Sequence, residues 1–291
     1  MGAAAPEEHT GTMATTPTTP RTGTFLWEGR RLAYEEHGEG DRVLLYLHGI
    51  LMDSEMNRGL ATALAERGHR VILLDLLGHG QSDKPTHASE YRMDTYALQV
   101  AACLDHLGIE EAVVGGVSLG ANVSLHLAVK DPGRVTALIL EMPVLEWAVP
   151  AAAILFAPLL LAAHYGRRVM RVASDLFARI PPTGFGPLNS VIRSAALPPE
   201  VVASVLHGIL VGPIAPTIDE RRAIEAPTLI LAHGNDLIHP FDDAVNLSEQ
   251  LPHASLMRTH GQLELRLMPT RLTKEIAAFV DGIWHPAKAA A

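Results

Sequence analysis

The chain has 291 residues, and its 32 acidic side chains outnumber 23 lysines and arginines to give a formal net charge of −9. This length suffices for a large core and fits one α/β domain with an insertion. The acidic balance, without any basic stripe, argues against a nucleic-acid-binding surface. The single cysteine, Cys103, excludes a disulfide framework within the chain. The protein therefore tolerates a reducing compartment, and we expect a cytoplasmic location.

Strand and helix patterns alternate along most of the chain. The first 22 residues are rich in Ala, Thr, Pro and Gly and lack the apolar stretch of a signal peptide, so we expect a disordered tail there. The alternation beyond the tail predicts a mainly parallel sheet with helices on both faces. The predicted strands cover 24–27, 31–36, 42–47, 70–75, 111–115, 135–141, 226–232 and 254–259, and the main predicted helices cover 55–67, 94–107, 119–130 and 273–283.

The run Gly116-Val117-Ser118-Leu119-Gly120 lies between a predicted buried strand and a predicted helix. Small residues two positions before and after Ser118 allow a tight turn that exposes the serine hydroxyl at the end of the sheet. G-x-S-x-G alone is a weak pattern that often occurs by chance. In a strand-turn-helix context it indicates a nucleophilic serine.

A nucleophilic serine needs a base within hydrogen-bond reach, and the base needs an acid that fixes its tautomer. On a sheet of this kind the chain order is serine, acid, histidine. Asp236 follows the strand predicted over 226–232, and His260 follows the strand predicted over 254–259. We therefore predict a catalytic triad of Ser118, Asp236 and His260.

Because it carries Ser118, Asp236 and His260 in this order, the chain resembles the α/β-hydrolase superfamily, and the resemblance extends from about residue 24 to residue 284. Four further stretches carry the resemblance. They are the strand and His-Gly loop over 44–50, the D-x-x-G-x-G-x-S turn within 75–85, the acid loop from Gly234 to Pro240, and the last helix over 273–283. Together these motifs are much more specific than any one of them.

The resemblance implies an α/β fold with a mainly parallel eight-stranded sheet, helices on both faces and a helical cap insertion. It implies an oxyanion hole formed by the backbone N–H groups of Ile50 and Leu119, and no cofactor. Two positions depart from the usual family pattern. Val117 stands where the family usually has histidine, and Thr259 stands where it usually has the glycine before the catalytic histidine. The second departure bears on the assignment of His260.

Other residues compete for the catalytic roles. His239 lies three residues after Asp236 and is expected to share its loop, so it is a poor candidate for the base. Glu141, at the end of the preceding strand, is the alternative acid. His48 and His79 belong to turn motifs and are expected to be structural. The histidines show neither H-x-H nor H-E-x-x-H spacing, so we expect no metal.

No strand pattern occurs between residues 142 and 226, and this gap is too long and too helical for a connecting loop. The resembled family carries a helical cap, or lid, at this point. We therefore expect a disordered tail over 1–22, an α/β-hydrolase core over 23–142 and 223–285, and a helical cap over 143–222.

Residues 147–165, inside the expected cap, are strongly apolar, and three interpretations compete. The segment can be a lid helix above a lipophilic substrate, can dock on a membrane surface, or can span a bilayer. Pro150 and Pro158 interrupt the segment, and a span here would split the sheet. The lid is therefore favoured, with membrane-surface contact as an open alternative.

A serine at the turn excludes the haloalkane dehalogenases and epoxide hydrolases of this fold, which use aspartate there. We therefore expect a serine hydrolase that cleaves a small lipophilic carboxylic ester, thioester or lactone through an acyl-enzyme. The alternative enzyme is a cofactor-free cyclase or C–C bond hydrolase acting on a polyketide-like or aromatic substrate. A non-catalytic small-molecule binding protein is the alternative from another class. The sequence does not indicate the oligomeric state.

Overall fold

One eight-stranded sheet organises the computed structural model, which describes residues 19–234, 236 and 238–285. The strand order is β1-β2-β4-β3-β5-β6-β7-β8. The pairs β1-β2 and β2-β4 are antiparallel, and all other neighbouring strands are parallel, as the sequence predicts. The strands are β1 (Arg21–Trp27), β2 (Arg30–His37), β3 (Val43–Leu47), β4 (Arg70–Asp75), β5 (Ala112–Val117), β6 (Val135–Glu141), β7 (Thr228–Ala232) and β8 (Ala254–Arg258).

Helices cover both faces of the sheet, because alternate side chains of the central strands are apolar on both sides. In β3, Leu44 and Tyr46 belong to one core, whereas Leu45 and Leu47 belong to the other. The first core includes α1 (Arg58–Ala65), α10 (Glu264–Leu267) and α11 (Thr270–Trp284). The second includes α2 (Met93–His106), α3 (Leu119–Lys130) and α9 (Phe241–Gln250).

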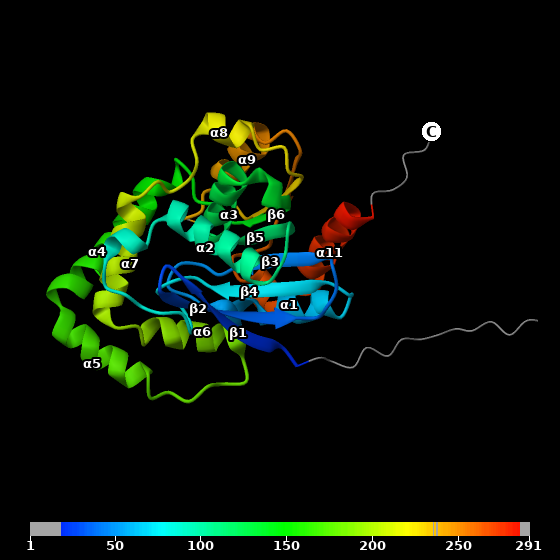
Figure 1. Ribbon diagram of the computed structural model, residues 1–291. Helices are drawn as coiled ribbons and strands as arrows, with labels where there is room; N and C mark the ends of the chain where they lie inside the picture. The colour runs from blue at the N-terminus through cyan, green and yellow to red at the C-terminus, as the bar shows by residue number, and fades with distance from the viewer. Residues whose placement is uncertain (1–18, 235, 237, 286–291) are drawn as a thin grey trace, which may run out of the picture.

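Residues 143–222, between β6 and β7, form no strand, and we call them the helical insertion. Figure 1 shows its first four helices together on the left, beyond one end of the strands. The inner helix is α7, which packs on α4 and α5 and has most of its side chains buried. The helices are α4 (Ala148–Tyr165), α5 (Arg167–Phe177), α6 (Gly186–Ala195), α7 (Pro199–Val211) and α8 (Ile218–Arg222).

Several helices, strands and segments begin or end at other residues than the sequence predicts. Of the expected disordered tail 1–22, residues 1–18 lie outside the described residues, and Arg21 and Thr22 already pair in the antiparallel ladder of β1. The helix expected over 55–67 is divided into a 3₁₀ turn, η1 (Ser54–Asn57), and α1. Pro158 lies inside α4 and does not end it, so one missing backbone donor is tolerated there.

Candidate active site

Ser118 occupies a sharp turn, since it is the only residue between β5 and α3. Its backbone angles, φ 52° and ψ −106°, are strained for a residue with a side chain. The turn needs glycine on both sides. A Cβ atom on Gly116 would come within 2.8 Å of Gly120, and one on Gly120 would come within 2.6 Å of Cβ of Leu47. The chain therefore presents the serine hydroxyl at the end of β5, as the motif predicts.

Three side chains form a continuous hydrogen-bonded chain at this turn. Oγ of Ser118 lies 2.9 Å from Nε2 of His239, and Nδ1 of His239 lies 2.7 Å from Oδ2 of Asp236. An ionised carboxylate only accepts hydrogen bonds, so Nδ1 carries the proton and donates it to Asp236. Nε2 is then free to accept the hydrogen bond from the Ser118 hydroxyl. This geometry suits proton transfer from the serine to the imidazole.

The Asp236 carboxylate is well stabilised in its ionised form. Its side chain is only 1% exposed. This burial alone would raise its pKa, but the hydrogen bond and charge of His239 and the backbone N–H groups of Ile238 and His239 hold the pKa well below its usual range. Oδ1 accepts the Ile238 N–H at 2.8 Å. The carboxylate therefore stays negative at neutral pH, where it can orient His239.

The structure corrects the predicted triad at the base. His260 does not bond to Ser118, since its side chain is 72% exposed and its Nδ1 lies 3.4 Å from Oε1 of Glu264. With Thr259 and Gly261 it lines an open surface hollow beyond the ends of β7 and β8. The structure thus brings Ser118 and Asp236 together, as expected, but through His239 in place of His260.

A shared loop was the reason for regarding His239 as a poor base, and this inference is wrong. The loop turns back at Asp236, because Oδ1 caps the N–H of Ile238 two residues later. The turn lets Oδ2 reach the His239 ring while the ring reaches the serine. The sequence contained one signal of this arrangement, namely Thr259 in place of the glycine that usually precedes the histidine after β8.

Glu141 is not available as the alternative acid. Its carboxylate forms a fully buried ion pair with Arg266 and accepts a hydrogen bond of 2.9 Å from the Tyr46 hydroxyl. Nη2 of Arg266 also donates to Oδ1 of Asn57 at 2.8 Å. Neutralised in this way, Glu141 ties the end of β6 to α10 and η1. Its backbone oxygen accepts the N–H of Ser118 at 2.8 Å and helps to fix the turn.

The loop after β3 contributes to the same site. Ile50 and Leu119, whose N–H groups are the predicted oxyanion-hole donors, both line the cavity that contains Ser118. His48 fixes this loop: its Nε2 accepts the N–H of Leu76 at 3.1 Å, so Nδ1 must carry the proton toward the Gly49 oxygen 2.8 Å away. Burial lowers the pKa of His48, which keeps the ring neutral in this role.

Ser118 faces a narrow apolar cavity of about 40 Å³. Among the described residues that line the cavity, Ser118 alone has a polar side chain, and the helical insertion supplies much of the rest, through Ala152 and Phe156 of α4 and Leu206 and Ile209 of α7. A neutral apolar group therefore fits beside the serine better than a charged one. The volume corresponds to only about three water positions, so larger groups require the insertion to move.

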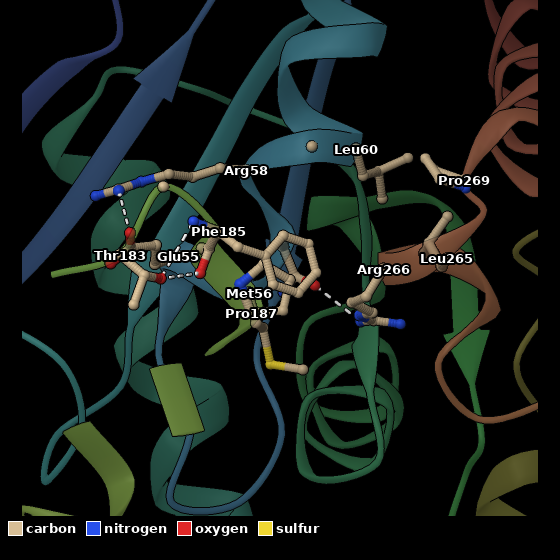
Figure 2. A pocket seen from close by; sticks show the side chains of 14 residues that line it. Glu55, Met56, Arg58, Leu60, Thr183, Phe185, Pro187, Leu265, Arg266 and Pro269 are labelled. Atoms are coloured by element: carbon tan, nitrogen blue, oxygen red, sulfur yellow. Dashed lines mark hydrogen bonds and ion pairs between the residues drawn. The ribbon is translucent and has the colours of Figure 1, made fainter. Parts of the chain in front are cut away.

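A second cavity of about 320 Å³ lies between η1, α10 and the loop before α6. Figure 2 shows that Phe185 and Pro187 of the insertion face Glu55, Arg58 and Arg266 across it. None of the three hydrogen-bonded residues at the serine lines this cavity. Although it is larger, it therefore lies apart from the hydrogen-bonded chain at Ser118. The described residues contain no cluster of three or more His, Cys, Asp or Glu side chains arranged to hold a metal ion.

Comparisons with known proteins agree with this geometry. The sequence profile of the alpha/beta hydrolase fold family matches residues 42–261. The chain is 30% identical over 241 residues to the AB hydrolase superfamily protein YisY of Bacillus subtilis (strain 168), covering 78% of this chain and 85% of that protein. It is 27% identical over 274 residues to the non-heme chloroperoxidase of Streptomyces lividans, covering 88% of this chain and 98% of that protein. The solved enol-lactonase from Burkholderia xenovorans LB400 aligns with a TM-score of 0.72 at 20% identity, covering 89% of this chain and 100% of that one.

Proposed function

The chain belongs to the α/β-hydrolase family of enzymes, and on this premise we propose that it hydrolyses a small lipophilic carboxylic ester, thioester or lactone through an acyl-enzyme. The observation that carries the proposal is the hydrogen-bonded chain from Ser118 through His239 to Asp236, which opens into an otherwise apolar cavity. A binding protein needs the cavity but has no need for an aligned nucleophile, base and acid.

In the proposed reaction the Ser118 Oγ attacks the carbonyl carbon while Nε2 of His239 takes the hydroxyl proton. The N–H groups of Ile50 and Leu119 hold the developing oxyanion. When the tetrahedral intermediate collapses, the imidazolium returns its proton to the leaving alkoxide or thiolate. Water then attacks the acyl-enzyme, gives a proton to His239 and releases the carboxylic acid and the free serine. Asp236 keeps the imidazole in the required tautomer in both half-reactions.

The cavity wall supports the substrate class. Apolar side chains from α4 and α7 surround Ser118, and the described residues that line the cavity include no cationic side chain to pair with a carboxylate or phosphate. We therefore propose that the acyl or lactone part of the substrate is neutral and apolar. Because only about 40 Å³ is open, short acyl groups enter the structure as it stands, whereas long chains require displacement of α4.

The test compares the purified protein with Ser118→Ala, His239→Ala and His260→Ala. Each protein is assayed on p-nitrophenyl esters of increasing acyl length and with a fluorophosphonate that labels activated serines. We expect Ser118→Ala to abolish labelling, and His239→Ala to lower kcat by about 10³-fold or more, because both remove a triad member. His260→Ala is the matched control, and it should retain labelling and turnover because its ring is exposed and the Ser118 hydroxyl bonds to His239 instead.

Each contrary outcome has a defined meaning. Full loss in His260→Ala with an active His239→Ala would restore the originally predicted base and refute the proposed one. Labelling that depends on Ser118 and His239, without turnover of any ester, thioester or lactone, would refute hydrolysis and favour the cyclase or C–C bond hydrolase alternative. A folded protein that neither labels nor turns over would favour a binding protein.

A further inference from the structure

The outer side of α4 is unusually apolar for a surface helix. The helix has 18 residues and a mean hydropathy of 1.8, and only 17% of it is buried. Its exposed side carries Ile154, Leu161 and Tyr165, which are seven and four residues apart and so share one face. Ala152 and Phe156 lie on the opposite side and line the cavity at Ser118. One helix therefore separates the serine from the solvent.

Helix α5 continues this apolar surface. Val169, Val172 and Leu176 lie on its exposed side at spacings of three and four residues, and Ser174 and Met170 face inward. The helix packs on α4, α6 and α7, and Figure 1 shows it at the outer edge of the insertion. We define the apolar outer face as the exposed side chains of Ile154, Leu161, Tyr165, Val169, Val172 and Leu176. Tyr165 and Val169 are 82% and 76% exposed, so no segment among residues 19–234 or 238–285 covers them.

Arginines flank this face, although the chain as a whole is acidic. The stretch 166–180 has four arginines and one acidic residue, Asp175, against a net charge of −9 for the whole chain. Arg167 and Arg171 reach inward to Glu200 of α7. Arg168 and Arg179 are exposed and form no ion pair with any part of the chain that the structure describes.

We propose that the apolar outer face docks on the surface of an anionic phospholipid bilayer. A helix that lies in the membrane interface has three features. Its polar and apolar faces are strongly separated, its apolar side chains enter the boundary between headgroups and acyl chains, and its arginines contact the lipid phosphates. Helix α5 has all three features, and Tyr165 has the amphipathic ring that favours the interface. The membrane contact that the sequence leaves open for residues 147–165 thus extends to α5, which lies beyond that segment.

The charge around the apolar outer face favours an anionic bilayer over a second copy of the chain as its partner. In a two-fold interface the same face meets itself, so Arg168 and Arg179 of each copy would approach arginines of the other across apolar contacts. An anionic bilayer instead supplies opposite charge at the rim and hydrocarbon at the centre. A span by α4 is not compatible with the fold, because the strands on either side of the insertion, β6 and β7, pair directly in the sheet.

The test measures co-sedimentation of the full chain with vesicles of phosphatidylcholine alone and with vesicles containing phosphatidylglycerol. We expect binding to the anionic vesicles that weakens with salt. Arg168→Glu with Arg179→Glu, and separately Val172→Asp with Leu176→Asp, should each weaken this binding by about tenfold or more. The matched controls are Lys274→Glu on α11 and Leu267→Asp on α10, which change an exposed cation and an exposed apolar side chain outside this face.

A melting transition at an unchanged temperature, measured for every variant, shows that the protein remains folded. Ser118→Ala should bind vesicles as the unmodified chain does, so the result is independent of the proposed reaction. No sedimentation with anionic vesicles, or equal loss of binding in the controls, would overturn the proposal. A dimer in solution that the α5 variants dissociate would also overturn it, because the face would then be an interface between copies.

Discussion

Asp236 and His239 lie three residues apart in one loop, so the acid and the base are positioned by the same short segment. The pKa of Asp236 is held well below its usual range, and the carboxylate is therefore negative wherever the protein is folded at moderate pH. Its role in the proposed triad is to hold the Nδ1 proton on His239. A neutral amide at this position can donate a hydrogen bond to Nδ1 and so favour the wrong tautomer.

We therefore predict that Asp236→Asn lowers kcat by about 10⁴-fold while leaving substrate binding largely intact. The measurement is steady-state hydrolysis of a short p-nitrophenyl ester, with kcat and KM determined separately. Asp242→Asn, on the exposed first turn of α9, is the matched control and should be unaffected. A large rise in KM at unchanged kcat would contradict the orienting role of Asp236.

At the residue scale, the sequence predicts Ser118 and Asp236 of the hydrogen-bonded chain but not His239, which joins them. Ser118 and Asp236 can be found because Ser118 directly follows β5 and Asp236 lies in the loop after β7, and the ends of parallel strands meet at one edge of the sheet. His239 cannot be found in this way, because its position depends on how the loop folds back from Asp236. A strand end is visible in the hydrophobic pattern, whereas the path of a five-residue loop is not.

At the scale of elements, α9 anchors the start of the helical insertion. Asp243 of α9 is fully buried and accepts the N–H groups of Leu145, Trp147 and Ala148 at 2.9–3.1 Å. These amides lie just before and at the beginning of α4, where the first donors of a helix lack acceptors within the helix. The carboxylate thus acts as a cap from another helix and joins α4 to the segment that follows the loop of Asp236 and His239.

Removing this cap should destabilise the protein. We predict that Asp243→Ala lowers the free energy of unfolding by about 2–3 kcal/mol, because it leaves the amides of Leu145 and Trp147 without their acceptor and removes one of the two acceptors of the Ala148 amide. The measurement is urea denaturation at pH 7. Asp242→Ala removes the exposed neighbouring carboxylate and should cost less than about 1 kcal/mol. Equal decreases in the free energy of unfolding in the two variants would show that Asp243 does not cap α4.

The element pattern of the core is the part that the sequence predicts best. Strands β4 and β6 and helix α3 have the predicted bounds, because strong hydrophobic periodicity ends at clear turn residues such as Gly133. Helix α9 is not among the predicted elements, since its apolar positions are few and its capping contact to α4 lies about 95 residues away. Such long-range contacts leave no local trace in the sequence.

At the scale of the whole molecule, the excess of acidic side chains makes buried carboxylates decisive for stability at low pH. Glu35 of β2 is the clearest case, because it joins the antiparallel edge of the sheet to α1. Its two oxygens accept Nε and Nη2 of Arg58 at 2.7 and 2.6 Å, and Oε2 also lies 3.5 Å from Nε2 of His37. Burial alone would raise the pKa of Glu35, but the neighbouring His37 and the hydrogen-bonded guanidinium of Arg58 lower it to about 2.

In the unfolded chain a glutamate has a pKa of about 4.3, so the folded value is the lower one. Glu35 therefore contributes stability that is complete above the unfolded pKa and is lost as the pH falls toward the folded pKa. The full contribution is about 3 kcal/mol, and more than half of it should be gone by pH 3.

We predict that Glu35→Gln destabilises the protein at pH 7 but that its deficit in the free energy of unfolding shrinks steadily between pH 5 and pH 3. Urea denaturation across this range measures the deficit, with Glu39→Gln as the control, because Glu39 pairs with Arg21 at the exposed surface and should contribute little at any pH. A deficit that stays constant with pH would mean that Glu35 stabilises the fold by packing and not by its charge.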